Sequence, residues 1–116
     1  MAQIAIPEQW RTTVCAILKA EDNNLIRWDP TGRKRYEATP GCHWAYEAHE
    51  AFRGFLSQPH PTGCHVTMNE PPGETYEFYF QFKGQQFYGK ILLRTDRKRI
   101  VIFSAHQPLK ARLSCE

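Results

Sequence analysis

Several features that would assign this chain to a familiar class are missing from its 116 residues. No stretch approaches the ~20 consecutive apolar residues of a membrane-spanning helix, so no membrane association is expected. The first ten residues, MAQIAIPEQW, have neither a basic segment nor a long apolar one, which predicts no secretory signal and a cytoplasmic location. Internal repeats and low-complexity segments are also absent. We therefore expect a single domain over residues 1–116.

Cysteine is sparse and lacks the spacing of a zinc site. The four cysteines are Cys15, Cys42, Cys64 and Cys115. No C-x₂-C or H-x₃-H pattern accompanies them, and the adjacent pair Cys64-His65 would point to opposite faces of a strand. Without a secretory signal, free thiols are expected rather than disulfides. The sequence predicts no metal and no other cofactor.

Basic residues are clustered, although the net charge is only +3. The clusters comprise Arg27 with residues 33–35, Arg94 with residues 97–99, and Lys110 with Arg112. Clustered cations suit a polyanion such as a nucleic acid, but they are equally typical of solvated turns. Both interpretations remain open at this point.

The most informative stretch is residues 74–106, which predicts three consecutive antiparallel strands with two unlike faces. One face is apolar and consists mainly of Tyr76, Phe78, Phe80, Phe82, Phe87, Ile91 and Leu93. The other carries Glu77, Tyr79, Gln81, Tyr88, Lys90, Arg94, Ser104 and His106, and strict alternation assigns Ile100 and Ile102 to it as well. A fourth strand, over residues 64–70, is predicted to add His65, Thr67 and Asn69 to this polar face.

Two amphipathic helices are predicted to cover the apolar face. The helix over residues 7–22 has the stripe Trp10, Val14, Ile17 and Leu18, and the helix over residues 43–58 has Trp44, Ala48, Phe52, Phe55 and Leu56. The resulting fold class is α+β, with two helices packed on one face of a four-stranded antiparallel meander.

An extra N-terminal β-hairpin is predicted over residues 25–38, with residues 29–32 as its turn. Arg27, Arg33 and Arg35 would share one side of this ribbon, and Lys34 would lie near its tip. Such a ribbon could straddle a phosphate backbone. Cations on an edge strand also protect against sheet-to-sheet association, so this function is not the only explanation.

The polar face has the residue types needed to cleave RNA through its 2′-hydroxyl. That reaction needs a general base, a general acid and cations that stabilise the phosphorane, and it needs no metal. We predict His106 as general acid or base, with Glu77 or His65 as its partner. Lys90 and Arg94 would hold the phosphate. The aromatic rings of Tyr79 and Tyr88 would stack on or position the bases.

The segment GQQFYGKILLRTDRKRIVIFSAH resembles the C-terminal hairpin of bacterial toxin ribonucleases of the RelE and MqsR kind. The matching positions are Gly84, Gln85, Tyr88, Lys90, Ile91, Asp96 and the strand over residues 100–103. The resemblance covers about a quarter of the chain. It implies a small, metal-independent endoribonuclease that acts on mRNA and is neutralised by a cognate antitoxin protein. It also implies a functional role for Tyr88, and for His106 as the basic residue that closes the last strand.

Two other functions fit the same residues. The basic, aromatic face could belong to a non-catalytic module that binds nucleic acid or protein, or a pocket between sheet and helices could bind a small molecule. Each polar residue taken singly also fits an ordinary strand position. The pattern predicts no oligomeric state. It leaves open whether the tail over residues 109–116 folds across the polar face.

Overall fold

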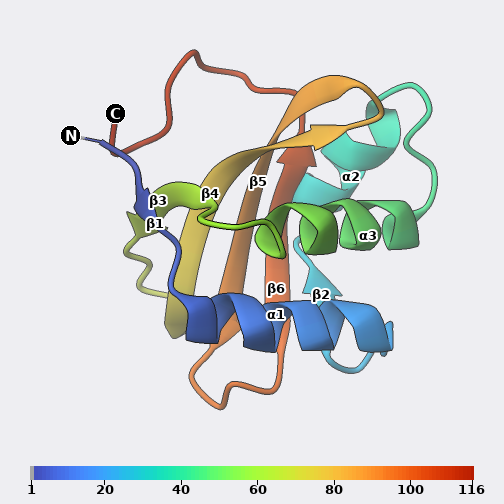
Figure 1. The fold of residues 1–116 in the computed structure, drawn as a ribbon. Helices are drawn as coiled ribbons and strands as arrows, with labels where there is room; N and C mark the ends of the chain where they lie inside the picture. The colour runs from blue at the N-terminus through green and yellow to red at the C-terminus, as the bar shows by residue number, and fades with distance from the viewer. Residues whose placement is uncertain (1) are drawn as a thin grey trace.

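The computed structural model describes residues 2–116, and its centre is a six-stranded mixed sheet with three helices (Figure 1). The strands are β1 (Ile4–Ala5), β2 (Ile26–Trp28), β3 (Thr62–Val66), β4 (Gly73–Phe82), β5 (Gln85–Arg94) and β6 (Ile100–His106). The helices are α1 (Glu8–Ala20), α2 (Pro30–Ala38) and α3 (Ala45–Leu56). The strand order across the sheet is β1-β3-β4-β5-β6-β2.

The four strands from β3 to β6 form the predicted antiparallel meander, and the α+β class is confirmed. Edge strand β1 was not predicted, and β2 was predicted only as the first arm of a hairpin, not as a parallel edge strand. β1 pairs with β3 in the antiparallel sense, while β2 pairs with β6 in the parallel sense and closes the opposite edge. Both are very short, so they carry almost no alternation that a sequence pattern could detect.

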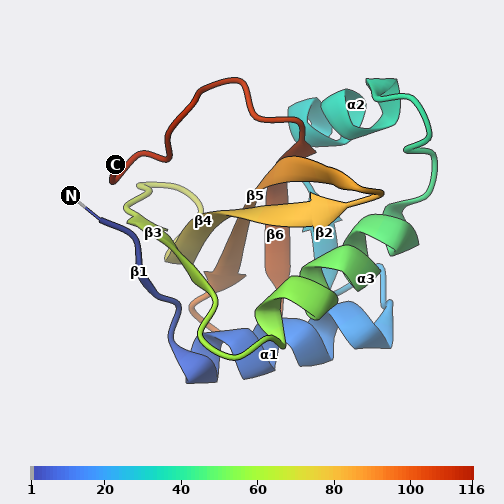
Figure 2. The same cartoon turned by 45° about the horizontal axis from the view of Figure 1, so that its top comes forward.

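Helices α1 and α3 lie together on the Phe-rich face of the sheet (Figure 2). The predicted stripe of α1 is buried in full, and Trp10 also donates a hydrogen bond from Nε1 to the Glu74 carbonyl at 3.0 Å. In α3 the prediction was wrong at one end of the stripe, because Trp44 is 62 % exposed. His49 of the same helix is buried and lies between Trp28 and Glu21.

The predicted hairpin over residues 25–38 was wrong. After the short strand β2 the chain enters helix α2, whose first residue is Pro30. The Asp29 side chain accepts a hydrogen bond from the Gly32 amide at 3.1 Å and so caps the helix. The same Asp-Pro-x-Gly run suits a turn or a helix start, and the local sequence does not decide between them. Arg27 is therefore on a strand and residues 33–35 are on a helix.

The predicted facing of the strand near residue 65 was also wrong. The register places Cys64 opposite Glu77 and His65 opposite Tyr76. His65 therefore projects to the helix side of the sheet, where its ring lies 5.3 Å from that of Tyr76. A register shift of one residue reverses every facing in a strand. The strand ends at Val66, so Thr67 and Asn69 lie beyond it.

The C-terminal tail, residues 107–116, returns from the end of β6 to the opposite edge of the sheet, near the N-terminal segment (Figure 1). A disulfide between Cys64 and Cys115 fixes its end, with a Cα–Cα distance of 5.6 Å. The expectation of four free thiols was wrong for this pair, and Cys15 and Cys42 are free. Across the described part of the chain, no helix is long and apolar enough to cross a membrane.

Candidate active site under the C-terminal tail

Four of the five predicted catalytic residues lie on three neighbouring strands of the polar face. The pairing aligns Glu77 of β4 with Lys90 of β5, and Tyr88 of β5 with His106 of β6. Residues aligned in this way have Cβ atoms about 5 Å apart. The sheet therefore brings these side chains into one cluster.

A β-bulge in β6 decides where His106 points. Lys90 pairs with Ser104 and Ile91 pairs with Ile102, which leaves Phe103 as the extra residue. Ile100 and Ile102 are consequently buried in the core on the helix side, although strict alternation had assigned them to the polar face. Past the bulge the facing reverses, and Ser104 and His106 point to the polar face. Without it, His106 would point toward the helices.

The tail forms a roof over this cluster, and between them lies a cavity of about 650 Å³ that is partly open to solvent. We call it the tail-covered cavity. Its sheet side is lined by Glu77, Tyr79, Tyr88, Lys90, Ser104 and His106, with Arg35 from α2, and its roof is residues 108–114 together with Glu116. Leu113 of the roof is buried, and the hydroxyl of Tyr79 donates to the Lys110 carbonyl at 3.4 Å.

Glu77 connects the sheet to the tail. One carboxylate oxygen accepts a hydrogen bond from the Tyr88 hydroxyl, and the other accepts one from the backbone amide of Ser114. Burial by itself raises the pKa of Glu77, but the hydrogen bonds from Ser114 and Tyr88, together with the charge of Lys90, lower it overall. The carboxylate is therefore ionised, and each of its oxygens already accepts a hydrogen bond. It is poorly placed to act as a free general base.

Tyr88 is held between Glu77 and His106. Burial, followed by its hydrogen bond to Glu77, raises the pKa of the phenol well above its usual value, so Tyr88 stays neutral. Its ring centroid lies 5.5 Å from that of His106. These contacts fix the position of the ring beside the imidazole.

His106 retains one ring nitrogen for chemistry. Its Nδ1 lies 2.7 Å from the Gln107 carbonyl oxygen, which can only accept, so Nδ1 is the donor. In the neutral ring, Nε2 then carries the lone pair. No other side chain or backbone group among residues 2–116 forms a hydrogen bond with Nε2. With this tautomer, Nε2 is the ring nitrogen that can accept a hydrogen bond or a proton from a ligand.

Lys90 contributes a positive charge beside His106. Its Nζ lies 5.6 Å from the centroid of the Phe103 ring, the residue at the bulge. Although Glu77 is its strand partner, the two side chains form no ion pair within 4 Å in the described residues. The ammonium group is therefore available to an anionic ligand.

The remaining predicted residues are divided among several places. Tyr79 and Arg35 line the tail-covered cavity, whereas His65 lies on the other face of the sheet. Arg27, Arg33 and Arg94 line a second hollow at the edge of the sheet, and Lys34 is exposed and lines neither. The site also contains tail residues that were not among the predicted site residues, including Lys110, Arg112 and Ser114. The pairing of Cys64 with Cys115 would have located them, but only with the strand facings known.

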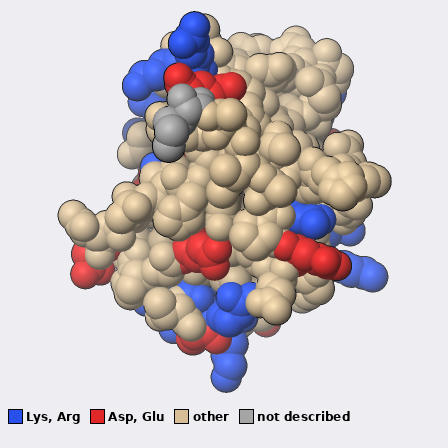
Figure 3. Space-filling model, turned by 60° about the vertical axis from the view of Figure 1, so that its left-hand side comes forward, with Lys and Arg blue, Asp and Glu red and all other residues tan. Residues whose placement is uncertain are grey.

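Among residues 2–116, no group of three or more His, Cys, Asp and Glu side chains is arranged as metal ligands. On the side of the molecule that carries the two termini, basic and acidic groups are scattered and form no continuous patch of one sign (Figure 3). Comparison of the chain with family models, with curated proteins and with solved structures finds no match.

Proposed function

We propose that the chain is a toxin-like, metal-independent endoribonuclease whose active site is the tail-covered cavity. The observation that carries this proposal is that one cavity is lined by both His106 and Lys90. Nε2 of His106 has no hydrogen-bond partner, and Lys90 forms no ion pair within 4 Å, among residues 2–116. A general base and a fixed cation are the two groups that attack by a 2′-hydroxyl most needs. The resemblance of residues 84–106 to toxin ribonucleases of the RelE and MqsR kind points to the same reaction.

In the proposed reaction, His106 Nε2 takes the proton of the 2′-hydroxyl, and that oxygen attacks the adjacent phosphorus. The bond from phosphorus to the 5′ oxygen breaks, giving a 2′,3′-cyclic phosphate and a 5′-hydroxyl end. Solvent water supplies the proton that the leaving 5′ oxygen takes up. Lys90 stabilises the charge that develops on the non-bridging phosphate oxygens.

Glu77 has a different role from the one its residue type suggested. With Tyr88 and Ser114 bonded to its two oxygens, it serves as a positioning residue that orients the phenol and anchors the tail. Tyr88 in turn restricts the imidazole of His106. Tyr79, half-buried at the cavity, can stack on a base, and Arg35, Lys110 and Arg112 supply positive charge around it.

The cellular setting follows from the proposed substrate. Activity on mRNA would place the protein in the cytoplasm, where Cys64 and Cys115 would be largely reduced. The tail would then be held mainly by Leu113 and by the bond from Ser114 to Glu77. A toxin of this kind would be neutralised by an antitoxin protein. Growth arrest on expression, relieved by Lys90→Ala, is the corresponding cellular result.

A non-catalytic RNA-binding module is the second candidate. One observation favours it: the carboxylate of Glu77 is fully occupied by structural hydrogen bonds, so the site has His106 but no second free acid or base of the expected kind. Such a module would use Lys90, Tyr79 and the basic tail to hold RNA without cleaving it.

The deciding experiment incubates a 5′-labelled RNA 20-mer with wild type, His106→Ala and Lys90→Ala and analyses the ends of the products. We expect wild type to produce 2′,3′-cyclic phosphate ends. Each variant should be at least about 100-fold slower, because general-base catalysis and charge stabilisation are each worth that much.

The matched control is His65→Ala, which removes an exposed histidine from the opposite face and should cleave like wild type. Residual cleavage by His106→Ala reports any contaminating ribonuclease, since all proteins are purified in the same way. Equal cleavage by wild type and His106→Ala would overturn the proposed mechanism. Binding of the RNA without cleavage by wild type would favour the binding module.

A further inference from the structure

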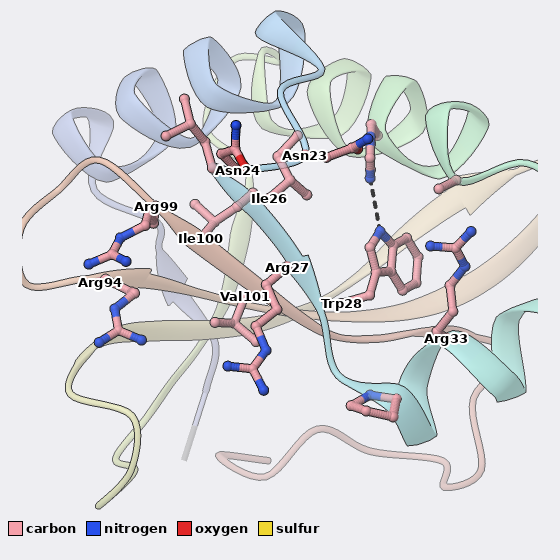
Figure 4. A pocket seen from close by; sticks show the side chains of 14 residues that line it. Asn23, Asn24, Ile26, Arg27, Trp28, Arg33, Arg94, Arg99, Ile100 and Val101 are labelled. Atoms are coloured by element: carbon pink, nitrogen blue, oxygen red, sulfur yellow. Dashed lines mark hydrogen bonds between the residues drawn. The ribbon is translucent and has the colours of Figure 1, made fainter.

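A second hollow, outside the tail-covered cavity, runs along the free edge of β2 (Figure 4). We call it the edge groove. Its volume is about 600 Å³, which is within the range of sites that hold a nucleotide-sized ligand. Its walls come from the α1–β2 loop, from α2 and α3, and from the ends of β5 and β6 that flank their connecting turn.

Four arginines from four segments of the chain line the edge groove. They are Arg27 of β2, Arg33 of α2, Arg94 at the end of β5 and Arg99 just before β6. In the close view the guanidinium groups of Arg94 and Arg99 lie on one side of β2, that of Arg33 on the other, and that of Arg27 below the strand (Figure 4). No aspartate or glutamate is among the lining residues, so the charged side chains that line the groove are all basic.

Two of these arginines are free for a ligand. Arg33 pairs with Glu37 at 3.0 Å and Arg99 with Asp96 at 2.9 Å, and neither acid lines the groove. For Arg27 and Arg94, no side-chain hydrogen bond or ion pair occurs among residues 2–116. Guanidinium groups without internal partners bind phosphate oxygens well, often through two parallel hydrogen bonds.

Part of the edge groove lies on the same face of the sheet as the tail-covered cavity. Arg27 pairs with Val101, Val101 pairs with Leu92, and the side chains of all three therefore lie on the face of Lys90. Arg94 follows Lys90 by four residues on the same strand and the same face, a distance of about 13 Å along β5. An extended polyanion that reaches Lys90 can therefore reach Arg94 and Arg27 also.

We propose that the edge groove binds the phosphodiester backbone of a nucleic acid strand, with Arg27 and Arg94 as its main phosphate ligands. The identity of that strand as RNA rests on the proposed function. The shared chemistry is phosphate, which a free nucleotide could also supply. The unpaired arginines Arg27 and Arg94 lie on the same face as Lys90. This arrangement favours a strand, because a strand can occupy both sites at once.

The test measures the binding of a fluorescein-labelled 12-residue 2′-O-methyl oligouridylate by fluorescence anisotropy at several salt concentrations. The 2′-O-methyl groups prevent cleavage during the titration. The double variant Arg27→Gln/Arg94→Gln should bind at least about 10-fold more weakly than wild type at low salt. Its slope of log affinity against log salt should be smaller in magnitude by about 1.4, since each phosphate contact to a single strand contributes about 0.7.

The matched control is Lys19→Gln, which removes an exposed cation of α1 that lines neither site and should leave affinity and salt slope unchanged. Equal binding by the double variant and wild type at every salt concentration would overturn the edge groove. A titration with ATP distinguishes the two sources of phosphate. If wild type binds ATP, and the double variant loses ATP binding but binds the oligonucleotide as wild type does, the groove is a site for free nucleotides. That result would overturn the proposal that it binds a nucleic acid strand.

The outcomes separate this inference from the proposed function. If neither wild type nor any variant cleaves RNA, but the double variant still has a lower affinity for the oligonucleotide, the edge-groove proposal is supported and the endoribonuclease proposal is not. If RNA cleavage depends on His106 but the double variant binds the oligonucleotide like wild type, the endoribonuclease proposal is supported and the edge-groove proposal is overturned.

Discussion

Glu77 is the residue through which the tail and the sheet depend on each other. Only 5 % of this residue remains exposed, because the strands and the tail cover it. A buried carboxylate is costly unless hydrogen bonds replace its lost hydration. The hydroxyl of Tyr88 and the amide of Ser114 do so, and they favour the ionised form. The charge of Glu77 therefore stabilises the folded chain.

This dependence predicts how stability changes with pH. Because the pKa of Glu77 in the folded chain lies below its ordinary value of 4.5, the stabilisation is fully present above about pH 4.5. It is lost as the pH falls through the folded-state pKa. Glu77→Gln should be about 1–3 kcal/mol less stable than wild type at pH 7, because the charge-assisted hydrogen bonds are weakened. Urea denaturation at pH 7 and at pH 3 measures this difference, which should shrink at the lower pH.

Glu50→Gln provides the control for that measurement. Glu50 is exposed on α3, and its side chain forms no hydrogen bond or ion pair among residues 2–116. Its replacement should change stability by less than about 0.5 kcal/mol at either pH. A Glu77→Gln protein as stable as wild type at pH 7 would contradict the role assigned to Glu77.

At the scale of elements, helix α2 and the bulge of β6 determine each other's position. The helix follows β2 in the chain and packs beside β6, in place of the second hairpin strand that was predicted. Its closest approach is at Gly32, where a Cβ atom would lie 2.0 Å from the carbonyl oxygen of Phe103. Only glycine permits this contact between helix and bulge, and the bulge in turn directs His106 into the cavity.

Gly32→Ala should therefore destabilise the protein by about 2 kcal/mol or more, since backbone rather than a flexible side chain must move. Activity should fall with it, because displacement of the bulge moves Ser104 and His106. Urea denaturation and the RNA cleavage assay measure the two effects.

Gly54→Ala is the matched control, since Gly54 lies in α3 with nothing within 4 Å of the position of its Cβ. That change should stabilise the protein by roughly 0.5–1 kcal/mol through helix propensity. Similar stabilities for the two alanine variants would contradict the close contact at Gly32.

For the whole molecule, the Cys64–Cys115 disulfide links the last residues to the sheet across 51 positions of the chain. A cross-link of this span restricts the unfolded chain strongly. It also holds the roof of the tail-covered cavity in place, because Ser114 and Leu113 directly precede the bonded cysteine.

Cys115→Ser should lower the free energy of unfolding by about 4 kcal/mol, the loop-entropy value for a closed loop of this length. The measurement is denaturation in guanidinium with and without a reducing agent. Reduced wild type should match Cys115→Ser, and Cys15→Ser, which removes a free thiol, should keep the response of wild type to the reducing agent. An unfolding midpoint of wild type that is unaffected by reduction would show that the disulfide contributes little.

The parts of the fold that the sequence predicted depend on local repetition. The stripe from Trp10 to Leu18 and the alternation of β4 and β5 each extend over many residues, and each has one buried side. The parts it did not predict depend on single residues. Asp29-Pro30 suits a turn or a helix cap, and the facing of Cys64 and His65 turns on a shift of one position.

The sequence by itself determined that β4, β5 and the last strand form a two-faced ribbon covered by two helices, because apolar periodicity is a local property. It also predicted that Glu77, Tyr88, Lys90 and His106 share a face. Only the tertiary structure decided which of them are free. The tail occupies Glu77, the bulge directs His106, and the parallel edge strand gathers the arginines of the edge groove. Each of these depends on a contact between segments far apart in the chain, which no local pattern specifies.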